Sequence, residues 1–247
     1  MKKRRIFKFI LIGVVALIAI AVLGLFIWSR TGTYPAGPTA IAALASTNSV
    51  TVTQDDWITF TPIGNPQTGL IFYPGGLVEP AAYAPVLHRL AQEGIMVVIA
   101  PMPLNLAILN TRIASDIIDT FPFIDRWILA GHSLGGASAA IFAENDSRSI
   151  DAMVFWDSYP PDSANLADNG LPVLSIYGTT NGVPNTDGFD ERRYLLPEDA
   201  EFVSIEGANH AQFGDYGPQK DDVTASITLT EQHEIVTAIM LDFIRQN

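Results

Sequence analysis

The 247-residue chain contains no cysteine, and this absence limits its chemistry. Without thiols it can form no disulfide, no thiolate metal site and no cysteine nucleophile. The sequence also lacks the His-x-x-x-His spacing of metal sites and the Gly-x-Gly-x-x-Gly run of dinucleotide sites. We therefore expect neither a metal ion nor another cofactor.

Basic side chains are scarce outside the first thirty residues. Six of the 14 Lys and Arg residues lie in residues 1–30, which leaves eight against all 26 Asp and Glu residues, a net charge of about −18 for the rest. Such a surface repels nucleic acid and anionic lipid headgroups. We expect no nucleic-acid partner and no polyanionic substrate.

The longest apolar run follows a basic cluster at residues 2–5. The run Ile6–Trp28 contains one charge, Lys8, and as a helix it would span the roughly 30 Å hydrocarbon core of a bilayer. A cleavable signal peptide has a shorter apolar region that ends at a small-residue site, which Trp28-Ser-Arg-Thr does not offer. The sequence favours an uncleaved transmembrane signal anchor at residues 6–28. With the basic end, residues 1–5, in the cytoplasm, we expect a single-pass protein of the cell membrane with an extracytoplasmic domain.

The remainder divides into a linker, residues 29–48, and one domain, residues 49–247. Two alternating segments at 50–53 and 57–61 predict an antiparallel strand pair. Apolar runs then alternate with helical patterns: the expected strands are 69–73, 95–101, 127–130, 152–156, 172–177 and 201–205, and the expected helices are 79–93, 104–121, 137–143, 190–196 and 230–245. This alternation predicts an α/β domain whose mostly parallel sheet is covered by helices on both faces.

A strand, a tight turn and a helix start are compressed into residues 127–136, with Ser133 at the apex. The sequence there is Gly131-His-Ser-Leu-Gly135, the Gly-x-Ser-x-Gly pattern of a nucleophile elbow. The two glycines leave room for the strained turn, and the helix N-terminus favours a developing oxyanion. Ser133 is therefore the candidate nucleophile. His132, the variable residue of the pattern, is expected to be structural, with its side chain pointing away from the serine.

In this order, several stretches resemble the α/β-hydrolase superfamily: Leu70–Leu77, Val98–Leu106, Gly131–Gly136, Leu174–Gly178 and Glu206–Gly217. The similarity covers roughly residues 50–247. It is greatest to the small, cap-poor, dienelactone-hydrolase-like domains of the α/β-hydrolase family 5 type, which are often membrane-anchored or secreted in bacteria. The resemblance implies an α/β-hydrolase fold with a minimal cap.

The resemblance also implies roles for individual residues. Ser133 would attack an acyl carbon, and His210, on the loop after the last strand, would act as its base. The backbone N–H groups of Leu134 and Gly76 would form the oxyanion hole. The implied activity is that of a carboxylesterase-type serine hydrolase that needs no cofactor and acts on a small-molecule ester. His88 and His233 lie on predicted helices and are expected at the surface.

The sequence offers several candidates for the third catalytic residue, the acid that would pair with His210 to complete a Ser-His-acid triad. Family members usually carry a carboxylate three residues after Gly178, and this chain has Asn181 there. An amide can orient the histidine but supplies no negative charge. There are two alternative acids. One is Asp157, directly after the expected strand 152–156, and the other is Asp187, six residues past Asn181. If Asn181 itself occupies the acid position, the chain is a weak enzyme or a catalytically inactive binding domain, which is the alternative function.

Overall fold

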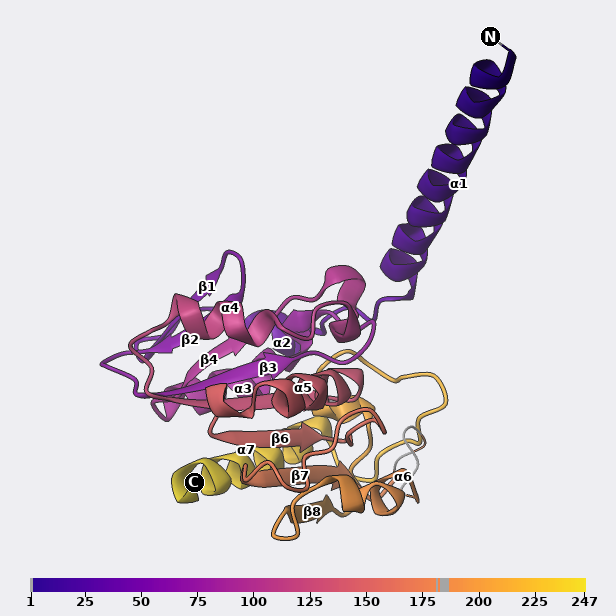
Figure 1. Ribbon diagram of the computed structural model, residues 1–247. Coiled ribbons are helices and arrows are strands. Elements are labelled where there is room, and N and C mark those ends of the chain that lie inside the picture. The colour runs from indigo at the N-terminus through magenta and orange to yellow at the C-terminus, as the bar shows by residue number, and fades with distance from the viewer. Residues whose placement is uncertain (1, 181, 183–186) are drawn as a thin grey trace. The chain divides into compact units, whose positions relative to one another are not determined.

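The computed structural model describes residues 2–180, 182 and 187–247, and the chain divides into two units (Figure 1). The first unit, Met1–Thr33, contains one helix, α1 (Lys2–Gly32). The stretch Phe7–Gly32 contains an 18-residue segment with a mean hydropathy of 3.2 and is long enough to cross a membrane. This match rests on length and composition alone, so the membrane anchor remains a prediction.

The second unit, Tyr34–Asn247, is built on an eight-stranded sheet. In spatial order the strands are β1 (Val50–Gln54), β2 (Ile58–Pro62), β4 (Met96–Ile99), β3 (Thr68–Tyr73), β5 (Arg126–His132), β6 (Ala152–Trp156), β7 (Val173–Gly178) and β8 (Glu201–Ile205). The pairs β1–β2 and β2–β4 are antiparallel, and every later pair is parallel. The predicted mostly parallel sheet, opened by an antiparallel strand pair, is therefore confirmed.

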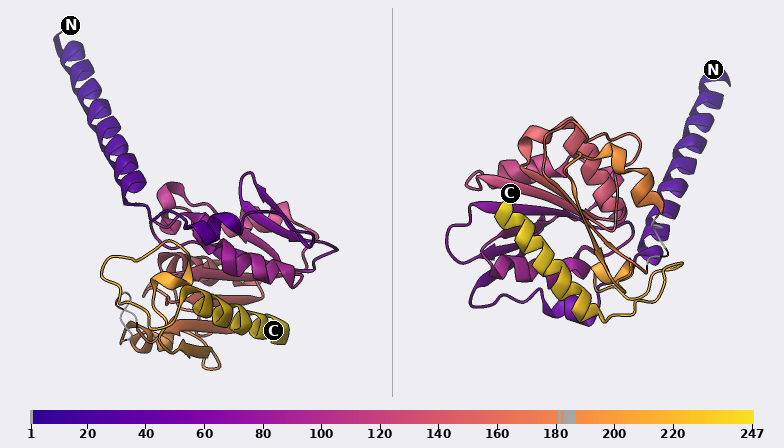
Figure 2. Two further views of the ribbon diagram at one scale, coloured as in Figure 1. Left: turned by 180° about the vertical axis from the view of Figure 1, so that it is seen from behind. Right: turned by 90° about the horizontal axis from the view of Figure 1, so that it is seen from below.

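Helices cover both faces of the sheet. Figure 1 shows α4 (Ile113–Thr120) and α5 (Leu134–Asn145) on the near face, and Figure 2 shows α3 (Ala84–Gln92) and α7 (Leu229–Gln246) on the opposite face. Because side chains alternate along a strand, Leu70 and Phe72 of β3 join the core beneath α3 and α7. Ile71 and Tyr73 join the core beneath α4 and α5. Both faces of β3 are thus buried, as its apolar sequence predicts.

Short helical turns complete the unit. They are α2 (Pro38–Ala42), η1 (Pro80–Tyr83), η2 (Pro103–Asn105), η3 (Ala107–Leu109), η4 (Ser147–Ser149), α6 (Asp187–Glu191), η5 (Arg193–Leu195) and η6 (Ala211–Phe213). The last helix, α7, begins at a capping box in which Thr228 and Glu231 satisfy each other's backbone N–H groups.

The predicted helix over 104–121 is wrong in its first half. The helix begins only at Ile113, and two short 3₁₀ turns, η2 and η3, precede it. Leu104 and Asn105 have φ values of 56° and 54°, which no right-handed helix accommodates. The Asn105 carbonyl accepts a hydrogen bond from the N–H of Leu77 (2.7 Å), a long-range contact that helical spacing in the sequence does not reveal.

Part of the segment expected as a linker packs on the domain. Tyr34 forms an isolated parallel bridge with Val78, and its N–H donates to the carbonyl of Leu77 (2.7 Å). The N–H of Ala40, on α2, donates to the carboxylate of Asp215 (2.8 Å). The second unit therefore includes residues from 34 onward, within the range 29–48.

Candidate active site

Ser133 occupies the strained turn between β5 and α5. Its φ and ψ are 52° and −124°, an unfavourable conformation for a residue with a Cβ. Two contacts hold the turn: the Ser133 N–H donates to the carbonyl of Trp156 (3.1 Å), and the Ser158 hydroxyl donates to the carbonyl of Ser133 (2.6 Å). The strain is therefore maintained by β6 and the loop that follows it.

The two elbow glycines sit where the turn leaves no space for a side chain. A Cβ on Gly135 would overlap the backbone carbonyl oxygens of Tyr73 and Pro74 at the end of β3. A Cβ on Gly131 would lie 2.6 Å from the backbone of Gly135 and Gly136. Close packing of α5 against β3 and β5 thus requires glycine at both positions.

Asp157 and His210 meet at the same end of the sheet. Asp157 follows β6, and His210 follows β8 and opens η6. Both side chains are fully buried, and the Asp157 Oδ2 atom lies 2.5 Å from the His210 Nδ1 atom. The other carboxylate oxygen, Oδ1, accepts the N–H of Gly178 (3.1 Å). A short hydrogen bond to a carboxylate stabilises a protonated imidazole, which is what an acid partner must do.

The other two acid candidates are less completely described. Asn181 lies outside the described residues. Asp187 is the first residue of α6, and its side chain is not among those described. Of the three candidates, the structure brings Asp157 to His210.

The backbone N–H groups near Ser133 identify the donors that are available to an oxyanion. In the loop after β3, Gly75 donates its N–H to the Tyr83 hydroxyl, Leu77 donates to Asn105, and Pro74 has no N–H. Among the described residues, the N–H of Gly76 has no acceptor. The N–H of Leu134 likewise has none in this part of the chain, because it lies in the first turn of α5.

Gly76 and Leu134 are neighbours in space. A Cβ on Gly76 would be 3.0 Å from the Leu134 side chain, so the loop after β3 passes directly beside the start of α5. This is the arrangement in which one donor from the elbow and one from the loop after β3 can share an acceptor.

His132 has a larger part in the site than the sequence predicts. Its side chain is fully buried, its ring centroid lies 4.3 Å from that of His210, and its Nδ1 atom is 2.8 Å from the hydroxyl of Tyr83. Burial, and next the charge of His210, hold the pKa of His132 well below its usual range. The structural role expected for His132 agrees with this environment, but the ring lies against His210 rather than away from the site.

Tyr83 links the loop after β3 to His132, a role that the sequence does not predict. Its hydroxyl accepts the N–H of Gly75 (3.0 Å) and can donate to Nδ1 of the neutral His132. Burial raises the pKa of Tyr83, which keeps its proton available as a donor. Tyr83 lies on a predicted apolar helix face, so periodicity alone marks it as a core residue.

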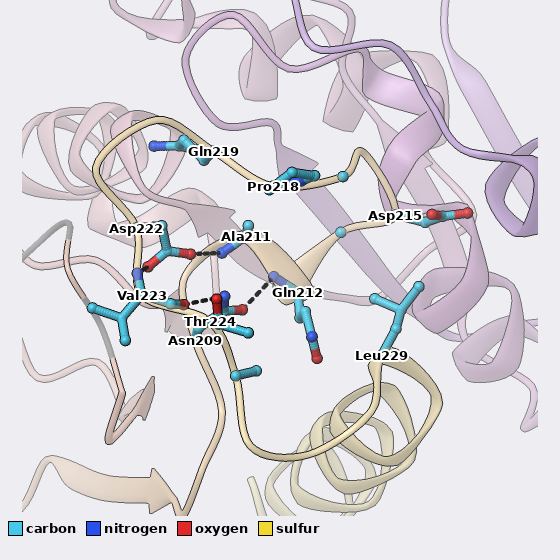
Figure 3. Close-up of a pocket in the computed structure, with 13 residues that line it drawn as sticks. Asn209, Ala211, Gln212, Asp215, Pro218, Gln219, Asp222, Val223, Thr224 and Leu229 are labelled. Carbon is cyan, nitrogen blue, oxygen red and sulfur yellow. Dashed lines mark hydrogen bonds between the residues drawn. The ribbon is translucent and has the colours of Figure 1, made fainter.

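A cavity of about 270 Å³ lies beside the His210 loop (Figure 3). The close-up shows Asn209, Ala211 and Gln212 on one side and Pro218, Gln219 and Asp222 on the other. Two hydrogen bonds join these sides: Ala211 donates its N–H to Asp222 (2.8 Å), and the Asn209 amide donates to the carbonyl of Val223 (2.6 Å). Ser133, Asp157 and His210 do not line the cavity, and the two hydrogen bonds fix the residues on either side of His210.

Comparison with known proteins agrees with this architecture. The model of the Alpha/beta hydrolase family matches residues 69–234, and the chain belongs to this family. No curated protein sequence matches the chain. The predicted α/β-hydrolase fold is thereby confirmed, and family membership supports a hydrolase.

Several solved structures share the fold at low sequence identity. Est1E from Butyrivibrio proteoclasticus is 16% identical with a TM-score of 0.57, and the match covers 80% of this chain and 100% of that one. MGS-MChE2, an alpha/beta hydrolase enzyme from a lagoon-sediment metagenome of Mar Chica, Morocco, is 17% identical with a TM-score of 0.60, covering 81% and 99%. A protein described as a predicted CIB-like hydrolase from Thermoplasma acidophilum is 11% identical with a TM-score of 0.63, covering 80% and 100%. At these identities the likeness extends to the fold alone.

Proposed function

We propose that the chain is a membrane-anchored, extracytoplasmic serine hydrolase that cleaves a carboxylic ester or a related acyl bond. The observation that carries this proposal is the buried contact of 2.5 Å between Asp157 and His210, at the same sheet edge as the strained Ser133. A buried carboxylate paired with a histidine, at the end of the sheet that also carries a serine elbow, supplies the groups that activate a hydroxyl for acyl transfer.

In this mechanism the Ser133 Oγ atom attacks the acyl carbon while its proton passes to Nε2 of His210. Asp157 stabilises the resulting imidazolium through Nδ1, and the N–H groups of Leu134 and Gly76 hold the oxyanion. His210 then gives the proton to the departing alcohol, which leaves an acyl-Ser133 ester. A water molecule, deprotonated by His210, attacks this ester, releases the acid and restores Ser133.

The alternative function, an inactive binding domain, rests on Asn181 in the usual acid position. Asp157 weakens that argument because it supplies His210 with the negative charge that an amide lacks. The anchor at residues 6–28 and the orientation with residues 1–5 in the cytoplasm rest on the length and hydropathy of α1 and on the basic cluster before it.

Ester hydrolysis by the full chain tests the proposal. We expect hydrolysis of p-nitrophenyl acetate or butyrate by detergent-solubilised protein, and a loss of about 10³-fold or more in kcat for Ser133→Ala. Ser163→Ala, at an exposed serine, serves as the matched control and should retain full activity. A folded Ser133→Ala variant with the activity of the parent would overturn the assignment of the nucleophile.

A further inference from the structure

Leu77, in the loop after β3, joins two other segments through its backbone. Its N–H donates to the carbonyl of Asn105 (2.7 Å), and its carbonyl accepts the N–H of Tyr34 (2.7 Å). Tyr34 is the first residue of the second unit and follows the last residue of α1, Gly32, by two positions. The loop that carries Gly76 therefore lies where the chain enters the domain.

The three segments that meet at Leu77 carry no charge. Residues 31–54, 74–78 and 94–111 contain no Asp, Glu, Lys or Arg, in a chain whose part after residue 30 has a net charge of about −18. Elsewhere the acidic surface would be repelled by anionic lipid. These three segments add nothing to that repulsion, and the carboxylates bonded to them, Glu79 and Asp215, accept the backbone N–H groups of Ala36 and Ala40.

The same region exposes apolar side chains. Ile108 and Leu109, on η3, are 47% and 53% exposed, and Leu104 and Leu106 beside them are half-buried. We call these four residues the apolar rim. The turn η3 packs against α5, the helix that begins after Ser133, so the apolar rim lies beside that helix. Clustered exposed apolar side chains mark a surface that contacts something less polar than water.

Two leucines here have a backbone conformation that favours glycine. Leu77 and Leu104 both have a φ of 56°, which costs about 1–2 kcal/mol for a residue with a Cβ. Glycine would remove that cost together with the side chain.

We propose that the apolar rim rests in the interface of the bilayer that holds α1, so that the serine site takes esters whose acyl chains lie in the membrane. The inference rests on the proposed function and on the proposed anchor. A bilayer is the occupant because the chain that leaves an apolar helix enters the domain at Tyr34, which is hydrogen-bonded beside the rim. Leucine and isoleucine side chains in an uncharged setting favour burial in that interface.

Because the chain has no cysteine, a single introduced thiol can report on contact with lipid. The full chain with Leu109→Cys, labelled with the fluorophore NBD and reconstituted in phosphatidylcholine vesicles, should be quenched by spin-labelled lipid about twofold or more above Ile63→Cys. Ile63 is the matched control because it is more exposed, at 72%, and lies at the opposite end of the sheet, before β3. Equal quenching at both positions would overturn the proposal, as would a blue shift of the Leu109→Cys label without quenching, which would indicate a protein partner.

Hydrolysis with two substrates separates this inference from the proposed function. The double variant Ile108→Glu, Leu109→Glu should lose about tenfold or more in hydrolysis of a pyrene-labelled acyl ester in vesicles and keep its hydrolysis of p-nitrophenyl acetate. Ile63→Glu should keep both. Equal loss on the two substrates would contradict the rim's role at the membrane, whereas a parent chain inactive on both would refute the serine hydrolase and leave the quenching result to decide the surface.

Discussion

The Asp157 carboxylate contacts Nδ1 of His210 at 2.5 Å, with both side chains removed from solvent. The two residues follow β6 and β8, and β7 lies between these strands in the sheet. The Asp157 side chain therefore reaches past the end of β7 to contact His210. This relationship gives the proposed triad its carboxylate.

The variant Asp157→Asn should lower kcat for ester hydrolysis by about 10³–10⁴-fold, because it preserves the size of the side chain and removes the charge that stabilises the imidazolium. Asn181→Ala is the comparison, and it should change kcat by less than about threefold if Asp157 is the acid. Steady-state kinetics on p-nitrophenyl butyrate measure both. If Asn181→Ala lowered kcat more than Asp157→Asn does, residue 181 would be the partner of His210.

Tyr83→Phe should destabilise the fold more than an ordinary tyrosine-to-phenylalanine change. It would leave two buried groups without a partner, the N–H of Gly75 and Nδ1 of His132, and each such group costs about 1–3 kcal/mol. We expect urea unfolding to give a loss of about 2 kcal/mol or more. Tyr194→Phe, at an exposed tyrosine, is the control and should stay within about 0.5 kcal/mol of the parent.

His233 should make the protein sensitive to acid. Burial, and next the charge of Arg89, lower the pKa of His233 to about 4, so the folded state holds the neutral ring. In the unfolded chain the ring takes up a proton near pH 6.5. The stability that the neutral ring gives the folded state is therefore complete above pH 6.5 and is lost progressively as the pH falls toward 4. Between pH 7 and 5 the free energy of unfolding should fall by about 2 kcal/mol through this residue.

His233→Gln tests that contribution, because glutamine does not titrate in this range. Urea unfolding at pH 7 and pH 5 should show a drop that is about 2 kcal/mol smaller in the variant than in the parent. An identical drop in both proteins would mean that His233 is not the titrating group.

Much of the fold could be predicted because its signals are local. The apolar strand runs, the alternation of β1 and β2 and the glycines around Ser133 each reflect a constraint within a few residues. The contacts that the sequence could not reveal are long-range. Asn105 pairs with Leu77 instead of continuing a helix. His132, at the end of β5, contacts Tyr83 of η1 and His210 of the loop after β8.

Burial of polar residues was equally difficult to foresee. His88 and His233 were expected at the surface, and that expectation is wrong: both are buried. His88 bonds the carbonyl of Ala43 in the segment that follows α2, and His233 lies on α7, which packs against α3. Helical periodicity identifies the face a residue occupies but not what covers that face.

Covalent labelling shows most directly whether Ser133 is an activated nucleophile. The full chain should be treated with a fluorophosphonate probe, digested and mapped by mass spectrometry, with Ser133→Ala and Asp157→Asn in parallel. We expect one adduct, on Ser133, that is absent from Ser133→Ala and forms far more slowly in Asp157→Asn. A folded parent that forms no adduct at Ser133 would contradict this expectation.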